Sequence, residues 1–449
     1  MDKQLQGLLG KTIKCPCGKS HSIPTKDIIF GEYTLYSIAS LTYKYFPKNT
    51  GITLIADKRT YALAGDALIS ALSYNSSSGW VDTIIVPDKK KYGQPKVDDE
   101  TIDYVLRRTR SKYIISLGAG SINDISKSVA TKIKGIYITI PTAPSMNGYT
   151  SSISAITSNG LKITTPAVPP VAVLCDTAIL SSAPKDLILA GLADLMSKPV
   201  CGTDWKLSHI MTNEYWCALP GKIVEHAEKQ CRAVAKDIGK GNPSAVATLT
   251  EGLLLSGMSM TIAGSSAPAS GGEHLISHYW DITADHEKRL PNLHGRQVGV
   301  ATILTGKLYA YLKNINPKSI NIANLTAQHP DWPARVKELR KLHTYLAPQI
   351  IPEVEKKFCT KENQAARLFF IKTNWSNIWQ QLNKTLLPWQ VTEKTLRTAG
   401  APVRAKQLGL SGKKLEHTLL SAKDMRARYT VLDLASDLGV LNKFIKETR

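Results

Sequence analysis

Residues 113–127 read YIISLGAGSINDISK, and this stretch decides the fold. Its first five residues form a short run uninterrupted by charge, which predicts a strand buried on both faces. Gly118 and Gly120 end the run, and a helix is expected to begin near Ser121. A strand, a glycine-rich turn and a helix in this order are typical of parallel α/β domains that bind nucleotide phosphates. Taken alone, the turn is equally compatible with a tight strand-to-helix connection.

Similar short runs flank this strand at 51–56, 81–87, 135–140 and 171–175, with helical stretches between them. This alternation predicts a Rossmann-like, doubly wound parallel sheet. From about Pro184 onward the strand signals vanish, and helical patterns follow at 185–198, 221–238, 244–264, 298–312 and 332–346. Because 449 residues exceed the size of one growing core, we predict an α/β domain over 1–182 and an all-α domain over 183–449. A ligand cleft is expected between them.

The formal net charge of +21 is unevenly spread, since residues 331–449 hold 22 Lys and Arg against 11 Asp and Glu. A positive field attracts phosphates and dinucleotides, but it also suits nucleic acid or an anionic surface. No nucleic-acid motif accompanies the charge, so we expect no nucleic-acid partner. A basic protein that binds nucleic acid or an anionic surface remains the alternative from another class.

Seven cysteines at irregular spacing favour a reducing compartment over a disulfide framework. The first residues, MDKQLQGLLGKTIK, lack the apolar core of a signal peptide, and no apolar run approaches about 18 residues. We therefore expect a cytoplasmic protein without membrane insertion. A homodimer or higher homo-oligomer is the general expectation for its assembly.

A second polar loop, 141–152 (PTAPSMNGYTSS), directly follows a predicted strand. It lies at the carboxyl edge of the sheet, where ligands of this architecture bind. Its small hydroxyl side chains and its Pro and Gly residues suit a rigid loop that offers hydrogen-bond donors. Thr142 and Ser145 are the expected ligand contacts, and an ordinary surface loop is the alternative.

The third feature is an acidic residue, Asp194, inside the apolar helical stretch LILAGLADLM. A buried lone carboxylate needs a cation or hydrogen-bond donors. Further on, SGGEHLISH places His274 and His278 four residues apart on one helix face, and PNLHGRQVG adds His294. One carboxylate and two or three imidazoles from different helices form the ligand set of an open, catalytic divalent metal site.

These motifs together resemble the iron-containing alcohol dehydrogenase and dehydroquinate synthase-like superfamily. The shared order is a Gly-rich turn with Asp and Lys after it, then Pro-Thr-x-x-Ser, Asp, His-x-x-x-His and His-Gly. PTAPSMNGYTS, GLADLMSKPVCGTDW, SGGEHLISH and LHGRQVG are similar to the bacterial glycerol-1-phosphate dehydrogenase branch, from about Ile52 to Tyr311. The resemblance implies a dehydroquinate synthase-like architecture.

The resemblance also implies roles for individual residues. Asp194, His274 and His294 would bind one divalent metal ion; zinc is favoured, and nickel or iron is also compatible. Asp124 and His278 would act in catalysis, with His278 beside the substrate rather than on the metal. The residues expected to hold NAD or NADP are Asp57, Gly118, Gly120, Ser121, Lys127, Thr142 and Ser145. Two departures from the family pattern are Ala119, which a phosphate loop tolerates only at negative φ, and Asn147, where a relative carries Asp.

The implied reaction is the reversible, NAD(P)H-linked reduction of dihydroxyacetone phosphate, a small phosphorylated substrate, to sn-glycerol 1-phosphate. Lys198, Lys288, Arg289 and Arg296 lie near the metal motifs and are candidate donors to the phosphate, although solvated surface charge is the plainer interpretation. Two enzymes on the same scaffold remain open, a 3-dehydroquinate synthase and a glycerol or other polyol dehydrogenase.

One motif stays outside this scheme. Cys15, Cys17 and His21 (CPCGKSH) offer three ligands where a closed structural zinc site needs four, and nothing nearby in the sequence completes the set. We interpret the motif as a turn with reduced thiols. The other cysteines, Cys175, Cys201, Cys217, Cys231 and Cys359, are expected to be small core residues.

Overall fold

The computed structural model describes residues 3–74, 78–410 and 412–448. Its centre is a six-stranded sheet with the order β3-β10-β7-β6-β4-β5, in which all neighbouring strands are parallel. The strands are β3 (Asp27–Gly31), β4 (Thr50–Asp57), β5 (Ser78–Val86), β6 (Tyr113–Gly118), β7 (Ile136–Pro141) and β10 (Ala172–Asp176). The predicted parallel sheet is confirmed, and the edge strand β3 is an addition to it.

Helices cover both faces of this sheet. On one face, α2 (Ile38–Tyr45) and α3 (Lys58–Tyr74) pack against side chains such as Leu54. On the other face, α4 (Asp99–Arg108) and α5 (Gly120–Lys132) pack against side chains such as Ile55. Because successive residues of a strand point to opposite faces, the uninterrupted apolar run of β4 is what a doubly covered strand requires.

Two small hairpins were not predicted. The first pairs β1 (Thr12–Lys14) with β2 (Ser20–Ser22), and the second pairs β8 (Ile153–Ser158) with β9 (Leu161–Pro166). Between β8 and β9, Asn159 and Gly160 adopt φ angles of 49° and 79°. An Asn-Gly pair between two β-forming runs is a strong hairpin signal, so this second hairpin was visible in the sequence.

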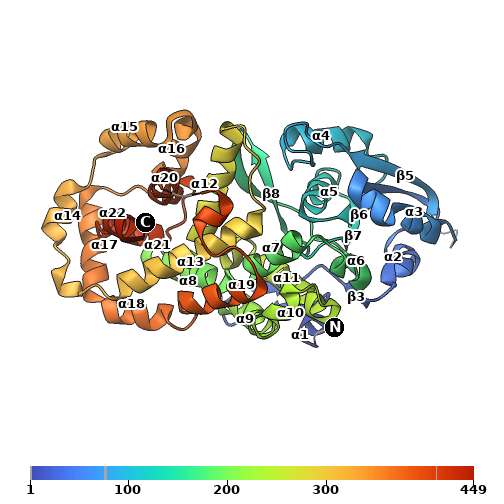
Figure 1. Cartoon of the computed structure of the whole chain (residues 1–449), viewed down its shortest axis with the longest axis horizontal. Coiled ribbons are helices and arrows are strands. Elements are labelled where there is room, and N and C mark those ends of the chain that lie inside the picture. The colour runs from blue at the N-terminus through green and yellow to red at the C-terminus, as the bar shows by residue number, and fades with distance from the viewer. Residues whose placement is uncertain (1–2, 75–77, 411, 449) are drawn as a thin grey trace.

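After α6 (Thr177–Ser181), the described chain is helical, as predicted (Figure 1). The helices are α7 (Lys185–Leu195), α8 (Lys198–Thr212), α9 (Ala218–Ala233), α10 (Ala235–Gly239), α11 (Pro243–Ala263), α12 (Gly272–His286), α13 (His294–Lys313), α14 (Ile322–Gln328), α15 (Trp332–His343), α16 (Ala347–Glu355), α17 (Lys361–Thr373), α18 (Trp375–Leu382), α19 (Trp389–Ala399), α20 (Lys413–Ser421), α21 (Val431–Asp437) and α22 (Leu441–Thr448). The helices expected at 185–198 and 221–238 end earlier, and α8 and α10 begin after short breaks. The division at 182/183 remains a prediction.

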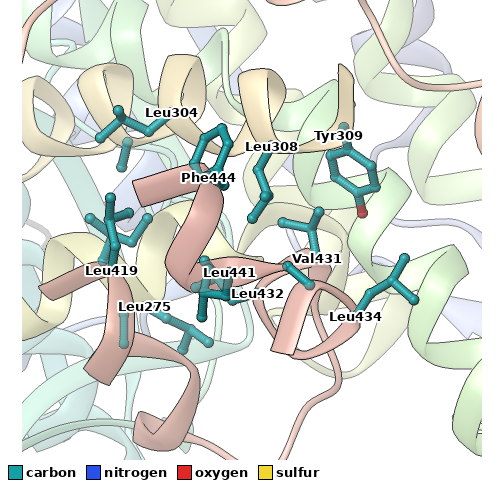
Figure 2. Close-up of a cluster of buried hydrophobic side chains, with 14 of the residues drawn as sticks. Leu275, Leu304, Leu308, Tyr309, Leu419, Val431, Leu432, Leu434, Leu441 and Phe444 are labelled. Carbon is teal, nitrogen blue, oxygen red and sulfur yellow. The ribbon is translucent and has the colours of Figure 1, made fainter. Parts of the chain in front are cut away.

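The C-terminal helices pack onto the helices that carry the histidines. Leu275 of α12 and Leu304 and Leu308 of α13 belong to the same buried cluster as Val431 of α21 and Phe444 of α22. Figure 2 shows these side chains meeting between α13 and the C-terminal segment. The basic region beyond residue 331 is therefore part of the helical core rather than an appended tail.

The N-terminal helix α1 (Lys3–Leu8) also joins the helical half. Leu5 and Leu8 are buried in one cluster with residues of α7, α9 and α11. Figure 1 shows α1 close to α10. The same cluster includes Ile28 of β3 and Val173 of β10, so the N-terminal segment joins the helical half to one edge of the sheet.

By length and composition, α11 could cross a membrane. However, 78% of its most apolar window is buried inside the structure. Burial of this kind is typical of the central helix of a large helical core, and the helix carries no further sign of a membrane span.

Candidate active site at the sheet-edge cleft

A cleft of about 720 Å³ extends from the carboxyl edge of the sheet to three histidines of the helical half. The loops after β4, β6 and β7 form its sheet side, and α12 and the start of α13 form the opposite side. The sequence-predicted site residues that line it are Asp57, Gly120, Ser121, Asp124, Thr142, Ser145, His274, His278 and His294. Three others, Gly118, Lys127 and Asp194, are buried and do not line it.

The glycine-rich turn aims the beginning of α5 at this cleft. Ala119 precedes the helix with φ −81°, and this negative φ is what a residue other than glycine requires at this position of a phosphate loop. It caps no backbone N–H group with its side chain, and Ser121 of the first turn lines the cleft. Uncapped N–H groups and the positive end of the helix dipole form an anion-binding site. A Cβ atom at Gly120 would come 2.8 Å from Met146 Cγ, so the turn has little room for a larger residue.

Lys127 braces the second loop from within the protein. Its ammonium donates to the carbonyl oxygens of Gly148 (2.6 Å) and Ile153 (3.0 Å) and to Ser151 Oγ (2.9 Å). Burial lowers the pKa of Lys127 to about 8. Asp124, with an oxygen 3.6 Å from this ammonium, faces the cleft, and burial raises its pKa. In the structure Lys127 therefore positions the loop, whereas Asp124 can reach a ligand.

Asp194, His274 and His294 converge although they are far apart in sequence. One ligand atom from each lies within 4.8 Å of the others. They come from three different helices, α7, α12 and α13, and α13 packs against both of the others. The sequence prediction that these side chains meet next to the cleft therefore agrees with the geometry, while their assignment as metal ligands remains a proposal.

Hydrogen bonds orient both imidazoles. His274 Nδ1 lies 2.8 Å from a carboxylate oxygen of Glu273, which can only accept, so Nδ1 carries the proton. Ser277 donates its single hydroxyl hydrogen to Gln297 and therefore accepts from His294 Nδ1 at 3.2 Å. In both rings the Nε2 lone pair is left free to bind a cation. Such outer partners are characteristic of histidines that bind metals.

Asp194 is held ionised in spite of its burial. Its Oδ1 accepts from Lys198 Nζ at 2.8 Å, and its Oδ2 accepts from the backbone N–H of Asn147 at 3.1 Å. Burial opposes ionisation, but the charge of Lys198 outweighs it, so the pKa of Asp194 lies far below its usual range. An ionised carboxylate and two free Nε2 atoms fit a divalent cation and leave coordination positions for a substrate.

Comparison with known proteins identifies the family. A family model described as iron-containing alcohol dehydrogenase matches residues 35–184. A glycerol-1-phosphate dehydrogenase (NAD(P)+) of Geobacillus stearothermophilus is 28% identical over 443 residues, which are 98% of this chain and 99% of the relative. The enzyme of the same name from Geobacillus thermodenitrificans is 32% identical over 305 residues, 67% of this chain and 74% of the relative. The chain belongs to the glycerol-1-phosphate dehydrogenase family.

Solved structures agree with the fold. Glycerol dehydrogenase from Schizosaccharomyces pombe has a TM-score of 0.59 at 14% identity and covers 94% of this chain and 90% of its own. NADH-dependent butanol dehydrogenase A from Thermotoga maritima has a TM-score of 0.60 at 14% identity, covering 94% and 97%. The dehydroquinate synthase-like architecture expected from the sequence is thereby confirmed. The alignment with the first relative also extends well beyond Tyr311, so the basic C-terminal region belongs to the family as well.

In this glycerol-1-phosphate dehydrogenase family member, His278 lies next to the cluster without joining it. Its ring centre is 6.1 Å from that of His274 and 5.5 Å from that of His294. Arg426 donates to its Nδ1 at 3.5 Å, which leaves the ring proton of the neutral form on Nε2. Burial, reinforced by the charge of Arg426, lowers the pKa of His278 well below its usual value.

Asp57 lies at the end of β4, on the wall of the cleft. Its Oδ1 accepts from the backbone N–H groups of Arg59 (2.7 Å) and Thr60 (3.0 Å). Arg59 also lines the cleft, and its guanidinium forms hydrogen bonds with both carboxylate oxygens of Asp88. The side chain of Asp57 is therefore held in a fixed position on the wall of the cleft.

The basic residues named from the sequence as phosphate donors are engaged elsewhere. Lys198 is bound to Asp194, Arg289 pairs with Glu287, and Arg296 pairs with Asp186. None of these, nor Lys288, lines the cleft. The cations that do line it are Arg59, Lys96 and Lys162.

Three further residues around the site, Glu273, Asp281 and Arg426, were not predicted from the sequence. Glu273 directly precedes His274, and a carboxylate next to a candidate metal histidine is a readable signal. Asp281 lies three residues after His278 and lines the cleft, and burial raises its pKa to about 6. Arg426 comes from the C-terminal segment, so only the tertiary fold could reveal it.

The interpretation of the Cys15 motif was wrong in one respect. A fourth candidate ligand lies beside the motif in the fold, since the ligand atom of Cys217 is within 4.8 Å of those of Cys15, Cys17 and His21. Cys217 is therefore not an isolated core residue. Cys175, Cys201 and Cys231 are buried as expected, whereas Cys359 is partly exposed.

Proposed function

We propose that this chain catalyses the reversible reduction of dihydroxyacetone phosphate to sn-glycerol 1-phosphate with NADH or NADPH. Relatives that align with most of its length bear the name of that activity. The observation that carries the proposal is the convergence of Asp194, His274 and His294 beside the cleft that begins at the sheet edge. The cleft thus combines a sheet edge that could bind a dinucleotide with a cluster of side chains that could bind an electrophilic metal ion.

The sheet side of the cleft would hold the dinucleotide. The uncapped start of α5 suits its pyrophosphate, and the hydroxyls of Thr142 and Ser145 offer further hydrogen bonds. Asp57 would accept from a ribose hydroxyl and would disfavour a 2′-phosphate, whereas the neighbouring Arg59 would favour one. A reduced nicotinamide bound here would supply the hydride.

Asp194, His274 and His294 would hold one divalent ion, zinc in our assignment, with nickel and iron as alternatives. Such an ion would act as a Lewis acid that polarises the ketone. Glu273 and Ser277 keep the two Nε2 atoms directed at it, and Asn147 fixes the carboxylate through its backbone N–H group.

His278 and Arg426 would act on the rest of the substrate. Neutral His278 holds its proton on Nε2 because Nδ1 accepts from Arg426, so Nε2 can pass a proton to the new alcohol, directly or through water. Arg426 is partly buried and forms no ion pair with a described carboxylate. Arg426 does not itself line the cleft, but it contacts His278, which does, so a substrate phosphate bound beside His278 would provide the anion that this guanidinium lacks.

The proposal also covers the cellular compartment and the oligomeric state. We place the enzyme in the cytoplasm, because all seven cysteines are free thiols in the structure. We also propose a homodimer or higher homo-oligomer.

The test is a metal-dependent assay of the purified protein. Chelation should abolish NADH oxidation with dihydroxyacetone phosphate, and reloading with Zn, Ni or Fe(II) in separate samples should restore it. A glycerol dehydrogenase would instead turn over unphosphorylated dihydroxyacetone, and a dehydroquinate synthase would convert its heptulosonate phosphate without net NADH consumption. These three outcomes separate the enzymes that share the scaffold.

Asp194→Ala supplies the matching variant. Loss of a metal ligand should remove the bound ion and lower kcat/KM at least about a hundredfold, since Lewis-acid stabilisation contributes several kcal/mol. Asp237→Ala, which removes an exposed carboxylate paired only with Lys240, is the control and should behave as wild type. A folded Asp194→Ala protein that retained both metal and turnover would remove the basis of the proposal.

A further inference from the structure

A second cluster of metal-binding side chains lies outside the cleft. Cys15, Cys17, His21 and Cys217 each place one ligand atom within 4.8 Å of the other three, and none of them lines the cleft. His21 and Cys217 are almost fully buried, with exposed fractions of 4% and 1%. Three thiols and one imidazole are the ligands of a closed structural zinc site.

The local fold explains how three of these residues come together. The hairpin β1–β2 closes with hydrogen bonds from Cys15 N to Lys19 O (3.1 Å) and from Gly18 N to Cys15 O (3.0 Å). Gly18 has φ 85°, which lets the chain turn sharply between the two cysteines and the returning strand. His21, in β2, is thereby brought back beside both thiols.

The fourth residue comes from the helical half. Cys217 directly precedes α9, 196 residues after His21 in the sequence. The segment before it is held in place because Trp205 Nε1 donates to the carbonyl of Tyr215 at 2.6 Å. The Tyr215 hydroxyl lies 3.3 Å from Cys17 Sγ, so the segment also contacts the hairpin directly.

Three of the six separations among the four ligand atoms are close to those of tetrahedral coordination, and all six are within 4.8 Å. With Zn–S bonds of about 2.3 Å and a Zn–N bond of about 2.0 Å, a regular tetrahedron has edges of roughly 3.5–3.8 Å. The observed separations are 3.6 Å for Cys15 Sγ to Cys217 Sγ, 3.7 Å for Cys217 Sγ to His21 Nε2 and 3.3 Å for Cys17 Sγ to His21 Nε2. A central ion could bind all four atoms with small adjustments.

We propose that Cys15, Cys17, His21 and Cys217 bind one structural zinc ion, distinct from the metal in the cleft. Three thiolates and a divalent ion give a net charge of −1, and Lys19 lies next to it with its ammonium 3.5 Å from the centre of the Tyr215 ring. The ion fastens the N-terminal hairpin to the start of α9. It therefore links the two ends of a loop of about 200 residues that contains the whole α/β part.

This site also has a mechanical connection to the cleft. Glu214, three residues before Cys217, accepts from Arg428 at 3.2 Å. Arg428 in turn donates to the carbonyl of Ser270 at 2.9 Å, and Ser270 lines the cleft just before α12. Zinc at the hairpin would thus steady the segment that positions His274, without touching substrate.

Cobalt substitution tests the proposal on the full-length protein. Asp194, His274 and His294 supply no sulfur, but Cys201 has its ligand atom within 4.8 Å of one of His274. A thiolate-to-cobalt charge-transfer band in the near ultraviolet is therefore assigned to the hairpin site by its loss in Cys217→Ser and its persistence in Cys201→Ser. Wild type should show this band and bind two equivalents of zinc. Cys217→Ser should lose the band and one equivalent, whereas His294→Ala should keep the band and lose the other equivalent. Cys359→Ser, which removes a thiol outside the cluster, is the matched control and should change neither reading.

Two results would overturn the proposal. One is cobalt-loaded wild type without a thiolate band, which needs no variant to fold. The other is a mass two hydrogens below that of the reduced chain, in protein purified without added oxidant, with a disulfide mapped between Cys15 and Cys217. Neither reading uses NADH turnover, so this test is independent of the proposed activity.

Discussion

Glu273 is buried, with an exposed fraction of 0%, and accepts from His274, Cys201 and the backbone of Gly271. Glu273→Gln keeps the shape but replaces one acceptor with a donor, so His274 Nδ1 loses a charged partner. We expect metal affinity to fall roughly tenfold to a hundredfold, as is usual for outer partners of ligating histidines. Metal titration of the chelated protein measures this, with Glu287→Gln at the surface as the control.

The unfolding midpoint of Glu273→Gln in urea distinguishes a loss of metal affinity from misfolding. Burial, followed by the charge of Glu273, raises the pKa of nearby Asp204 to about 7. Neutralising Glu273 relieves that repulsion, so the variant should unfold at no lower urea concentration than wild type. Weak metal binding combined with a much lower unfolding midpoint would speak against an orienting role.

Arg426 is the residue on which phosphate specificity depends in our scheme. Arg426→Ala should raise KM for dihydroxyacetone phosphate roughly tenfold to a hundredfold, because hydrogen bonds to charged groups contribute about 1.5–3 kcal/mol. Its KM for unphosphorylated dihydroxyacetone should stay close to the wild-type value, and Arg426→Lys should recover part of the loss. Equal effects on both ketones would show that Arg426 acts only through His278.

Asp281 predicts a pH-dependent stability. Its pKa is raised from 3.8 to about 6, mainly by burial, so the folded chain favours the protonated form. Above pH 6 the ionised carboxylate therefore lowers stability, by up to about 3 kcal/mol, and less if the cleft's solvent screens it. Below about pH 4 the carboxyl is protonated in both folded and unfolded chains, and the penalty disappears.

Asp281→Asn should accordingly be more stable than wild type near pH 7, and the difference should shrink to zero as the pH falls from 6 to 4. Urea unfolding of the metal-free protein at a series of pH values measures it. Asp237→Asn, at an exposed position, should show no such trend. A difference between Asp281→Asn and wild type that did not vary with pH would contradict the raised pKa.

Helix packing determines whether the ligands meet. A Cβ atom at Gly295, directly after His294, would overlap the carbonyl oxygen of Ala190 in α7, so α13 and α7 are in backbone contact there. Asp194 lies one turn beyond Ala190 on the same helix. The closeness of Asp194 and His294 thus depends on the absence of a single side chain.

Gly295→Ala should therefore push the two helices apart. We expect a loss of about 1–3 kcal/mol in stability, typical of an overpacked core, together with loss of the cleft metal. Gly221→Ala, within α9, is the matched control because an added Cβ there meets nothing within 4 Å, and it should be neutral or slightly stabilising. Metal content and thermal unfolding of the two variants test both expectations. Full metal occupancy in Gly295→Ala would contradict the prediction.

The same elements show what the sequence could reveal. Buried strands such as β4 and β6 can be predicted because both of their faces carry apolar residues. The turn before Ser121 can be predicted because its glycines directly precede the start of a helix. The short strands β1 and β2 are mostly polar and only three residues long, so they leave no periodic signal. Cys217 could not be joined to Cys15 because nothing local in the sequence marks a contact across about 200 residues.

The whole molecule is closed by a bridge across the cleft. Asp285, near the end of α12, accepts from Lys91 and Lys96 at 2.8 Å each, and both lysines belong to the loop after β5. Lys96 and Asp285 line the cleft, so the bridge joins the α/β and helical parts at the binding site itself. All three side chains are roughly one quarter to one third exposed, which limits each pair to about 0.2–1 kcal/mol.

The bridge predicts that NADH dissociates faster when the bridge is removed, whichever sign of charge is lost with it. Asp285→Asn and Lys96→Gln alter the net charge in opposite directions, but both remove the Lys96–Asp285 pair, and Asp285→Asn also removes the Lys91–Asp285 pair. If the bridge holds the cleft closed, both should raise the NADH dissociation rate, by up to roughly fivefold for one lost pair. Stopped-flow measurement of NADH fluorescence gives this rate, with Lys229→Gln, from an exposed pair within α9, as the control. If the NADH dissociation rate rose in one variant and fell in the other, Asp285 and Lys96 would act only through their charges on an anionic cofactor. Loss of closure should raise the rate in both variants, whereas a change of charge should affect the two in opposite directions.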